Sequence, residues 1–186
     1  MTAKPAIVLS CVTTIISALL IVAHNLTYVD TSGIITEKLM QKCVSLMGEG
    51  EYSIVSDWKQ SGYAIDRPDS VSKLILKDDG TLAFEIVANG YNKGGLDLLI
   101  AMNSDGSVAG IEVVSMTETP GLGTNVNDPD FLARFAGISD SAVIVKKTPT
   151  VSGEVEAVTG ATYSSKGVAA AVNTAVSVYA ELGVSV

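Results

Sequence analysis

The sequence predicts an α+β protein, in which a single N-terminal transmembrane helix precedes one mainly antiparallel sheet with flanking helices. An uncharged apolar run covers residues 6–23, two aspartate-glycine pairs separate apolar strands, and an amphipathic helical pattern closes the chain. The 186 residues are 47% hydrophobic and their mean hydropathy is +0.39. This composition is too apolar for an ordinary soluble domain of this size and indicates a membrane segment.

The N-terminal run, "AIVLSCVTTIISALLIVA", contains no charged residue. At about 1.5 Å per residue, roughly 18 to 21 residues reach across the hydrocarbon core of a bilayer. A cleaved signal peptide is the alternative, but the run is longer than the usual hydrophobic region of about 7 to 15 residues and lacks a small-x-small exit. Cys11 does not indicate a lipoprotein, because most of the apolar run follows it.

The charges on either side of the run predict its orientation in the cell membrane. Lys4 and the free amino terminus precede the run, and Asp30 is the first charge after it. An excess of positive charge marks the cytoplasmic side of a span. We therefore expect a cytoplasmic N-terminus and an extracytoplasmic domain.

A helix is predicted directly after the membrane segment, within "TSGIITEKLMQKCVSLMG". Apolar residues recur there near helical spacing, with Thr31 or Ser32 able to cap the start and Gly48 able to end the helix. We interpret it as a helix that links the membrane to the domain. The predicted organisation is a membrane segment over residues 1–26, a linker helix over residues 27–50 and one domain over residues 51–186.

The next part of the chain predicts two β-hairpins. "SKLILKDDGTLAFEIVANGY" places two apolar strands around Asp79-Gly80, and "LDLLIAMNSDGSVAGIEVVSM" places two more around Asp105-Gly106. We expect about four strands in meander order, with the glycine-rich loop "NGYNKGG" between the two pairs.

The C-terminal half begins with the loop "TETPGLGTN", whose proline and glycines interrupt the strand pattern. Asp128 and Pro129 then predict the capped start of a short helix that runs to about Ala136. "AVIVKK" and "EVEAV" are expected strands. Apolar residues at three- and four-residue spacing predict a final helix from about Ser164 to Leu182.

Composition excludes several functions. The formal net charge is −8 and no basic stripe is present, so we expect no nucleic-acid binding. Cys11 lies in the span and Cys43 beyond it, so the two are not expected to pair, and without CxxC spacing or clustered histidines we expect no metal site. His24, the only histidine, is expected at the membrane interface.

The segment "AVTGATYSSKGV" is predicted to be a strand-to-helix turn with Thr162 at or near the helix N-cap. A helix N-terminus offers free N–H groups and the positive end of the helix dipole, which favour a phosphate. Gly160 and Ala161 leave room for a ligand to approach the backbone. The simpler alternative, which spacing alone favours, is that Thr162 only caps the helix, a role worth about 1 kcal/mol. The side chains that could assist a phosphate are those of Ser164, Ser165 and Lys166.

Thr159-Gly160-Ala161-Thr162 resembles the S/T-G-A-T motif of the FMN-binding domain that Rnf complexes have in their G subunit and sodium-pumping NADH:quinone reductases have in their C subunit. "GYNKGGLDLLIAMNSDGSVAGIEVVSMTETPGLG" resembles the glycine-tyrosine segment, hairpin and E-T-P-G-L-G loop of the same family, and "DPDFLARF" resembles the helix that follows. The resemblance implies that Thr162 carries FMN through a phosphoester bond, installed by a separate flavin transferase.

The resemblance also implies where the rest of the cofactor lies. The loop of residues 118–123 is expected against the isoalloxazine ring, with Leu122 in apolar contact and the glycines presenting backbone donors. The N–H groups of the helix and Lys166 are expected to balance the phosphate charge. The other implied cofactor-binding residues are Thr159, Gly160, Ala161, Ser164, Ser165, Glu118, Thr119, Gly121 and Gly123.

By this resemblance the protein is a membrane-anchored electron-transfer subunit with covalent FMN in a Rnf-type ferredoxin:NAD oxidoreductase complex coupled to Na⁺ or H⁺ translocation. The compact length favours the Rnf branch over the quinone reductases. No acid-base pair is evident, so we expect no independent catalytic site and assign ion passage to the other membrane subunits. The alternatives are the corresponding subunit of a sodium-pumping quinone reductase, a standalone anchored electron carrier, and a flavin-free structural or sensory domain.

Overall fold

The computed structural model describes residues 4–27 and 33–183, and the chain divides into two units between residues 31 and 32. The N-terminal unit contains helix α1 (Lys4–Thr27). Within α1, Ile7–His24 is long and apolar enough to cross a membrane. Its mean hydropathy is 2.3, and no part of this stretch is buried. The helix has the length and apolar surface that the sequence predicted for a membrane span.

The second unit is built on a five-stranded antiparallel sheet whose strands lie in sequence order. The two predicted hairpins are confirmed, and their turns contain Gly80 and Gly106 with φ of +89° and +80°. Glycine adopts this left-handed conformation without steric cost. The short first strand was not predicted. The strands are β1 (Tyr52–Ile54), β2 (Val71–Lys77), β3 (Leu82–Ala88), β4 (Leu96–Met102) and β5 (Val108–Met116).

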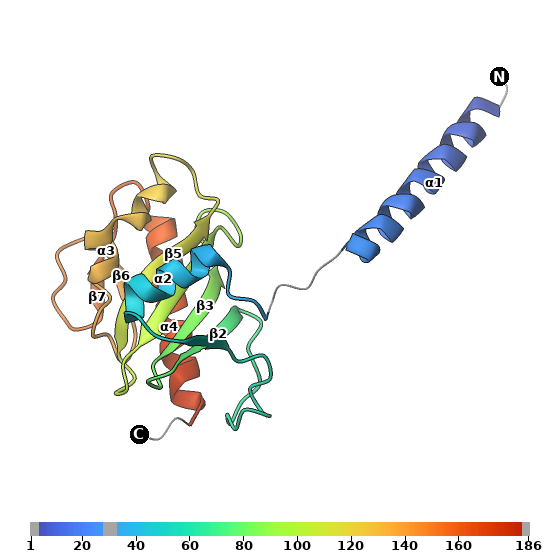
Figure 1. Ribbon diagram of the computed structural model, residues 1–186. Coiled ribbons are helices and arrows are strands. Elements are labelled where there is room, and N and C mark those ends of the chain that lie inside the picture. Colours follow the sequence, from blue (N-terminus) through green and yellow to red (C-terminus); the bar gives the residue numbers. More distant parts are fainter. Residues whose placement is uncertain (1–3, 28–32, 184–186) are drawn as a thin grey trace. The chain divides into compact units, whose positions relative to one another are not determined.

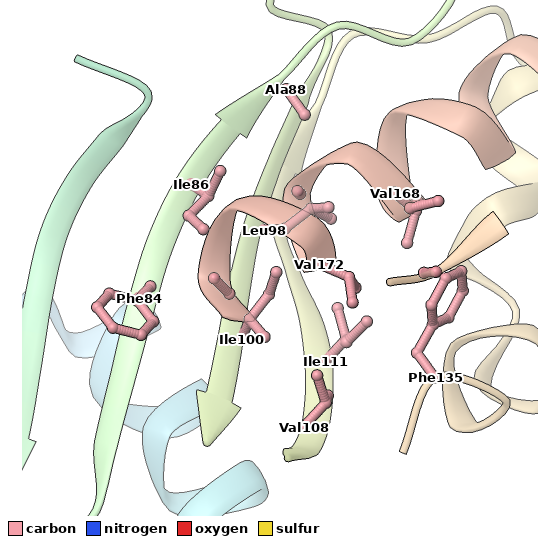
Figure 2. Packing of buried hydrophobic residues seen from close by; sticks show 14 of the residues in the cluster. Phe84, Ile86, Ala88, Leu98, Ile100, Val108, Ile111, Phe135, Val168 and Val172 are labelled. Carbon is pink, nitrogen blue, oxygen red and sulfur yellow. The ribbon is translucent and has the colours of Figure 1, made fainter. Parts of the chain in front are cut away.

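Helices cover both faces of this sheet: α2 (Glu37–Met47) lies on one face and α4 (Thr162–Glu181) on the other (Figure 1). The main core lies under α4, where Val168 and Val172 face side chains of β4 and β5 such as Leu98 and Ile111 (Figure 2). A smaller core under α2 contains Ile75, Ala83, Leu99 and Ala101. Burial on both faces explains why the central strands are apolar almost throughout.

Helix α2 packs on the sheet through Leu39 and Cys43, both of which are buried. Its N-cap is Thr36, whose hydroxyl accepts a hydrogen bond from the Leu39 N–H at 3.3 Å. The predicted caps, residues 31 and 32, lie outside the described residues. Gly48 ends the helix as predicted, with φ of +80°.

Cys43 is a packing residue with an inert thiol. Burial, assisted by the negative charge of Glu85, raises the pKa of the Cys43 thiol to about 11. Polar contacts also hold α2 to β5, where Lys42 and Ser45 both donate to the Glu112 carboxylate, at 3.3 and 3.2 Å.

The segment between β5 and α4 contains a 3₁₀ helix, η1 (Gly123–Asn127), and a short helix, α3 (Pro129–Ala133). Asp128 caps α3 as predicted, accepting from the Asp130 N–H at 2.8 Å, but α3 ends three residues before the predicted Ala136. The two expected strands, β6 (Val143–Val145) and β7 (Glu154–Glu156), form a separate parallel pair. Strand β7 leads directly into the turn before α4.

Candidate functional site

A pocket of about 360 Å³ lies where the loop after β5 meets the loop after β3 and the start of α4. Its volume falls within the range of small-molecule sites, about 300 to 1,000 Å³. Three segments that are far apart in sequence therefore build one concavity. The lining residues are Tyr91, Thr119, Leu122, Gly123, Gly160, Ala161, Thr162, Tyr163 and Ser164.

The first turn of α4 forms one wall of the pocket. Gly160 has φ of +78°, and Ala161 is the N-cap residue, so no side chain caps this helix. Thr162 is the first helical residue, and among the described residues its hydroxyl has no hydrogen-bond partner. The interpretation of Thr162 as a capping residue is therefore wrong, and no side chain accepts a capping hydrogen bond from the N–H groups of this turn.

Ser165 is turned into the protein instead of into the pocket. Its buried hydroxyl donates to the Ala161 carbonyl at 2.9 Å and accepts from the Val158 N–H at 3.1 Å. These bonds brace the turn between β7 and α4. Thr159 and Lys166 are exposed and do not line the pocket.

Glu118 also faces inward, although the sequence placed it against the ligand. Its carboxylate, 5% exposed, accepts hydrogen bonds from the backbone N–H groups of Tyr91 at 3.1 Å and Asn92 at 3.0 Å. The hydroxyl of Ser164 donates a third hydrogen bond to it. Glu118 thus lies behind the pocket wall and connects all three segments that form the pocket.

Glycines make room for this carboxylate. A Cβ on Gly123 would lie 2.5 Å from Glu118 Oε2, and a Cβ on Gly90 would lie 2.7 Å from Glu118 Oε1. A Cβ on Gly95 would also collide with Glu118 Oε1. Gly90 and Gly95 of "NGYNKGG" and Gly123 of "PGLG" therefore make room for the buried carboxylate, a role that the sequence alone did not predict.

The carboxylate of Glu118 is ionised at neutral pH. Burial by itself raises the pKa of this carboxyl, but the hydrogen bonds from Ser164, Asn92 and Tyr91 together lower it further than burial raises it. The result is a pKa below the usual glutamate value. A fixed negative charge therefore lies behind Gly123 and Ser164, which line the pocket.

The rim of the pocket is aromatic and apolar. Tyr91 and Tyr163 are 71% and 69% exposed, and their rings meet edge to face with centroids 6.3 Å apart. Leu122, which is 51% exposed, also lines the pocket, and a Cβ on Gly160 would lie 3.3 Å from it. Large exposed side chains gathered at one concavity indicate a ligand or partner site. The two tyrosines were not among the predicted contacts.

The loop that carries Leu122 is held by its own hydrogen bonds. The Thr119 carbonyl accepts from the Thr124 N–H at 3.2 Å, and the Thr124 hydroxyl accepts from the Gly121 N–H at 3.0 Å. Gly121 has φ of +73° and is exposed outside the pocket lining. The structure thus brings together Thr162, Gly160, Ala161, Ser164, Thr119, Leu122 and Gly123 at the pocket.

Comparison with known proteins matches residues 90–177 to the FMN-binding domain family. Over 101 residues the chain is 37% identical to the G subunit of the proton-translocating ferredoxin:NAD(+) oxidoreductase complex of Clostridium ljungdahlii, covering 54% of this chain and 55% of that protein. Over 129 residues it is 30% identical to the G subunit of the Na(+)-translocating ferredoxin:NAD(+) oxidoreductase complex of Acetobacterium woodii, covering 66% of this chain and 62% of that protein. The chain thus spans less than two thirds of the length of these relatives.

A solved structure shares the fold. The C subunit of the Na(+)-translocating NADH-quinone reductase of Parabacteroides distasonis matches with a TM-score of 0.53 and 22% identity, over 80% of this chain and 84% of that chain. The family match includes Tyr91, the loop that carries Leu122, and Thr162 at the start of α4. Residues 90–177 therefore match the FMN-binding domain family, and this stretch contains every residue that lines the pocket.

Proposed function

We propose that the protein is a membrane-anchored electron-transfer subunit of a Rnf-type ferredoxin:NAD oxidoreductase complex, and that Thr162 carries its FMN through a phosphoester bond. The observation that carries the proposal is the position of Thr162. It is the first residue of an uncapped helix, it lines the pocket, and among the described residues its hydroxyl has no hydrogen-bond partner. The proposal also rests on the FMN-binding domain match and on the names of the relatives.

The residues that line the pocket suit both the phosphate and the ring of FMN. The N-terminus of α4 offers N–H groups and a positive dipole to a phosphate diester, which keeps one negative charge. Lys166 lies four residues after Thr162, on the same side of the helix, and its exposed side chain adds positive charge. The exposed side chains of Tyr91 and Leu122 offer apolar surface to an aromatic ring.

FMN supplies the electron transfer, and the protein supplies position and polarity. Thr162 would fix the phosphate end of the cofactor, so that binding persists whatever its oxidation state. Tyr91 and Leu122 would shield the ring end from water on two sides. The fixed charge of Glu118 behind Gly123 and Ser164 would disfavour additional negative charge in the pocket.

We propose that α1 anchors the protein in the cell membrane with its N-terminus in the cytoplasm and the flavin domain outside it. Ile7–His24 contains no acidic residue, lysine or arginine. A single span of this kind offers no pathway for an ion. Translocation of Na⁺ or H⁺ is therefore assigned to other membrane subunits, and attachment of FMN to a flavin transferase.

The test uses membrane vesicles that contain the assembled complex. Thr162→Val is expected to reduce ferredoxin-dependent NAD reduction at least about 100-fold, because an electron carrier is removed, while assembly of the subunits is unchanged. Thr174→Val is the matched control, since it makes the same change on α4 at a hydroxyl that donates to the Ala170 carbonyl. Unchanged NAD reduction in an assembled Thr162→Val complex would overturn the proposal.

A further inference from the structure

We propose that Glu118 is a positioning residue, whose buried carboxylate locks the two pocket loops to the start of α4 and thereby fixes the flavin ring in place. The inference rests on the proposed function, since it concerns the same pocket. It assigns to Glu118 a role without contact to the cofactor.

The hydrogen bonds of the carboxylate support this role. Oε1 accepts from the Asn92 N–H, and Oε2 accepts from the Tyr91 N–H and the Ser164 hydroxyl. Tyr91 and Ser164 both line the pocket, on opposite segments. One side chain therefore sets the distance between a rim residue and the first turn of the helix that carries Thr162.

The surroundings of this position fit a carboxylate better than an amide. All three hydrogen bonds are donated to Glu118, so an ionised group that only accepts satisfies every partner. Glutamine has nearly the same shape, but whichever way its amide is turned, its NH₂ group faces at least one backbone N–H. Because Gly90, Gly95 and Gly123 already lie against the carboxylate, the loops can relieve that conflict only by moving away from residue 118.

Other bonds keep the loops folded when Glu118 is changed. The Thr117 N–H donates to the Gly95 carbonyl at 2.9 Å, and the Asn92 side chain donates to the Thr117 carbonyl. The Gly94 N–H donates to Asn89 Oδ1 at 2.7 Å. We therefore expect Glu118→Gln to fold, with a pocket that is looser instead of absent.

The chain offers a matched control in Glu85. Its exposure is the same 5%, and its carboxylate pairs with Lys73 at 2.6 Å on the α2 face of the sheet. Glu85→Gln therefore disturbs an equally buried carboxylate that does not touch the pocket. This control shows how far a loss of stability away from the pocket changes the exposure of the flavin.

The experiment uses the full chain produced together with an active flavin transferase and purified in detergent. In Glu118→Gln we expect the Stern–Volmer constant for iodide quenching of the bound flavin to rise at least about threefold. Amide hydrogen exchange should be at least about tenfold faster at Tyr91 or Asn92, at whichever backbone N–H faces the new NH₂ group. Glu85→Gln should leave both readouts within about twofold of wild type, while its unfolding midpoint falls.

A second variant guards against misfolding of the first. Ser164→Ala removes one of the three donors and should give intermediate values of quenching and exchange. Wild-type quenching and exchange in both Glu118→Gln and Ser164→Ala would overturn the inference, as would an equal rise in Glu85→Gln. If wild type itself carries no flavin, the proposed function fails, and the exchange rates at Tyr91 and Asn92 still decide whether Glu118 locks the loops.

Discussion

The hydroxyl of Ser164 donates a hydrogen bond to the carboxylate of Glu118, joining the first turn of α4 to a loop 46 residues earlier in the chain. Both residues are buried, and both lie against Gly123. This contact lies directly behind Gly123 and Ser164, which line the same pocket as Thr162. The strength of this hydrogen bond and the ionisation of Glu118 lead to predictions that can be tested on the isolated protein.

Ser164→Ala should lower the free energy of unfolding by about 1 to 2 kcal/mol at pH 7, because a charged acceptor loses one of three donors. The pKa of Glu118 is lowered in the folded state, so its contribution is present above the unfolded pKa and is lost as the pH falls through the folded pKa. The difference between variant and wild type should therefore shrink in acid. Urea unfolding at pH 7 and pH 3 measures it, and a difference that stays constant would contradict this account.

Gly123→Ala should be strongly destabilising, by about 2 to 3 kcal/mol, because its Cβ would lie 2.5 Å from Glu118 Oε2 and 2.8 Å from Ser164 Oγ. Gly137→Ala is the control: Gly137 has φ of +81° and open space around its Cβ position, so only backbone strain of about 1 kcal/mol is expected. Thermal and urea unfolding compare the two. The order of the two losses is the decisive result, and the reverse order would show that the carboxylate can move aside.

Tyr91→Ala and Leu122→Ala should change the free energy of unfolding by less than about 1 kcal/mol, because both side chains are more than half exposed. Each should nevertheless increase iodide quenching of the bound flavin, because each removes a side of the proposed ring site. Val151→Ala, at a side chain that is 63% exposed and outside the pocket lining, is the control. Quenching equal to that of the control would place the ring elsewhere.

Asp97→Asn should alter the pH dependence of stability. Asp97 lies on β4, and within the described residues its Oδ1 is buried without a hydrogen-bond partner. Burial first, and then the charge of Glu85, raise the pKa of Asp97 to about 6, although Lys73 opposes the rise. The folded state therefore binds more protons than the unfolded state between the unfolded pKa of about 3.9 and the folded value, and Asp97 destabilises the protein increasingly as the pH rises through this window.

Replacing Asp97 by asparagine removes this titration. The unfolding free energy of the variant minus that of wild type should increase from pH 4 to pH 7 by on the order of 1 to 2 kcal/mol, as measured by urea titration. The other carboxyls titrate in both proteins, so their contribution cancels when the two unfolding free energies are subtracted. A difference that falls with rising pH would mean that ionised Asp97 is stabilised in the folded state.

The elements with local signals could be predicted from sequence. The hairpins at Asp79-Gly80 and Asp105-Gly106 follow from turn chemistry that needs no distant partner, and Asp128 before Pro129 marks the start of α3. Strand β1 could not be predicted, because its alternating pattern, Tyr-Ser-Ile, is only three residues long and the strand forms by pairing with β2. The docking of α2 on the sheet depends likewise on a face that exists only after folding.

In the site, too, the residues in local motifs could be predicted, and those whose position depends on distant segments could not. The motif and loop patterns identified Thr162 and Leu122, and the structure brings both to one pocket. The inward direction of Glu118 and Ser165 could not be predicted, because it depends on backbone donors supplied by the loop after β3 and by the turn after β7. A signal for Tyr91 was available, since an aromatic residue inside the glycine-rich "NGYNKGG" is unusual for a plain connecting loop.

Covalent attachment of FMN to Thr162 is tested by the intact mass of the full chain purified from its native membrane, beside a Thr162→Val variant. In wild type we expect an added mass equal to one FMN less one water, with ultraviolet fluorescence that survives denaturation. In Thr162→Val we expect neither, with a stability close to that of wild type, because no described residue bonds to the Thr162 hydroxyl. An unmodified wild-type mass from membranes with an active flavin transferase, or an added mass that persists in Thr162→Val, would show that Thr162 does not carry FMN.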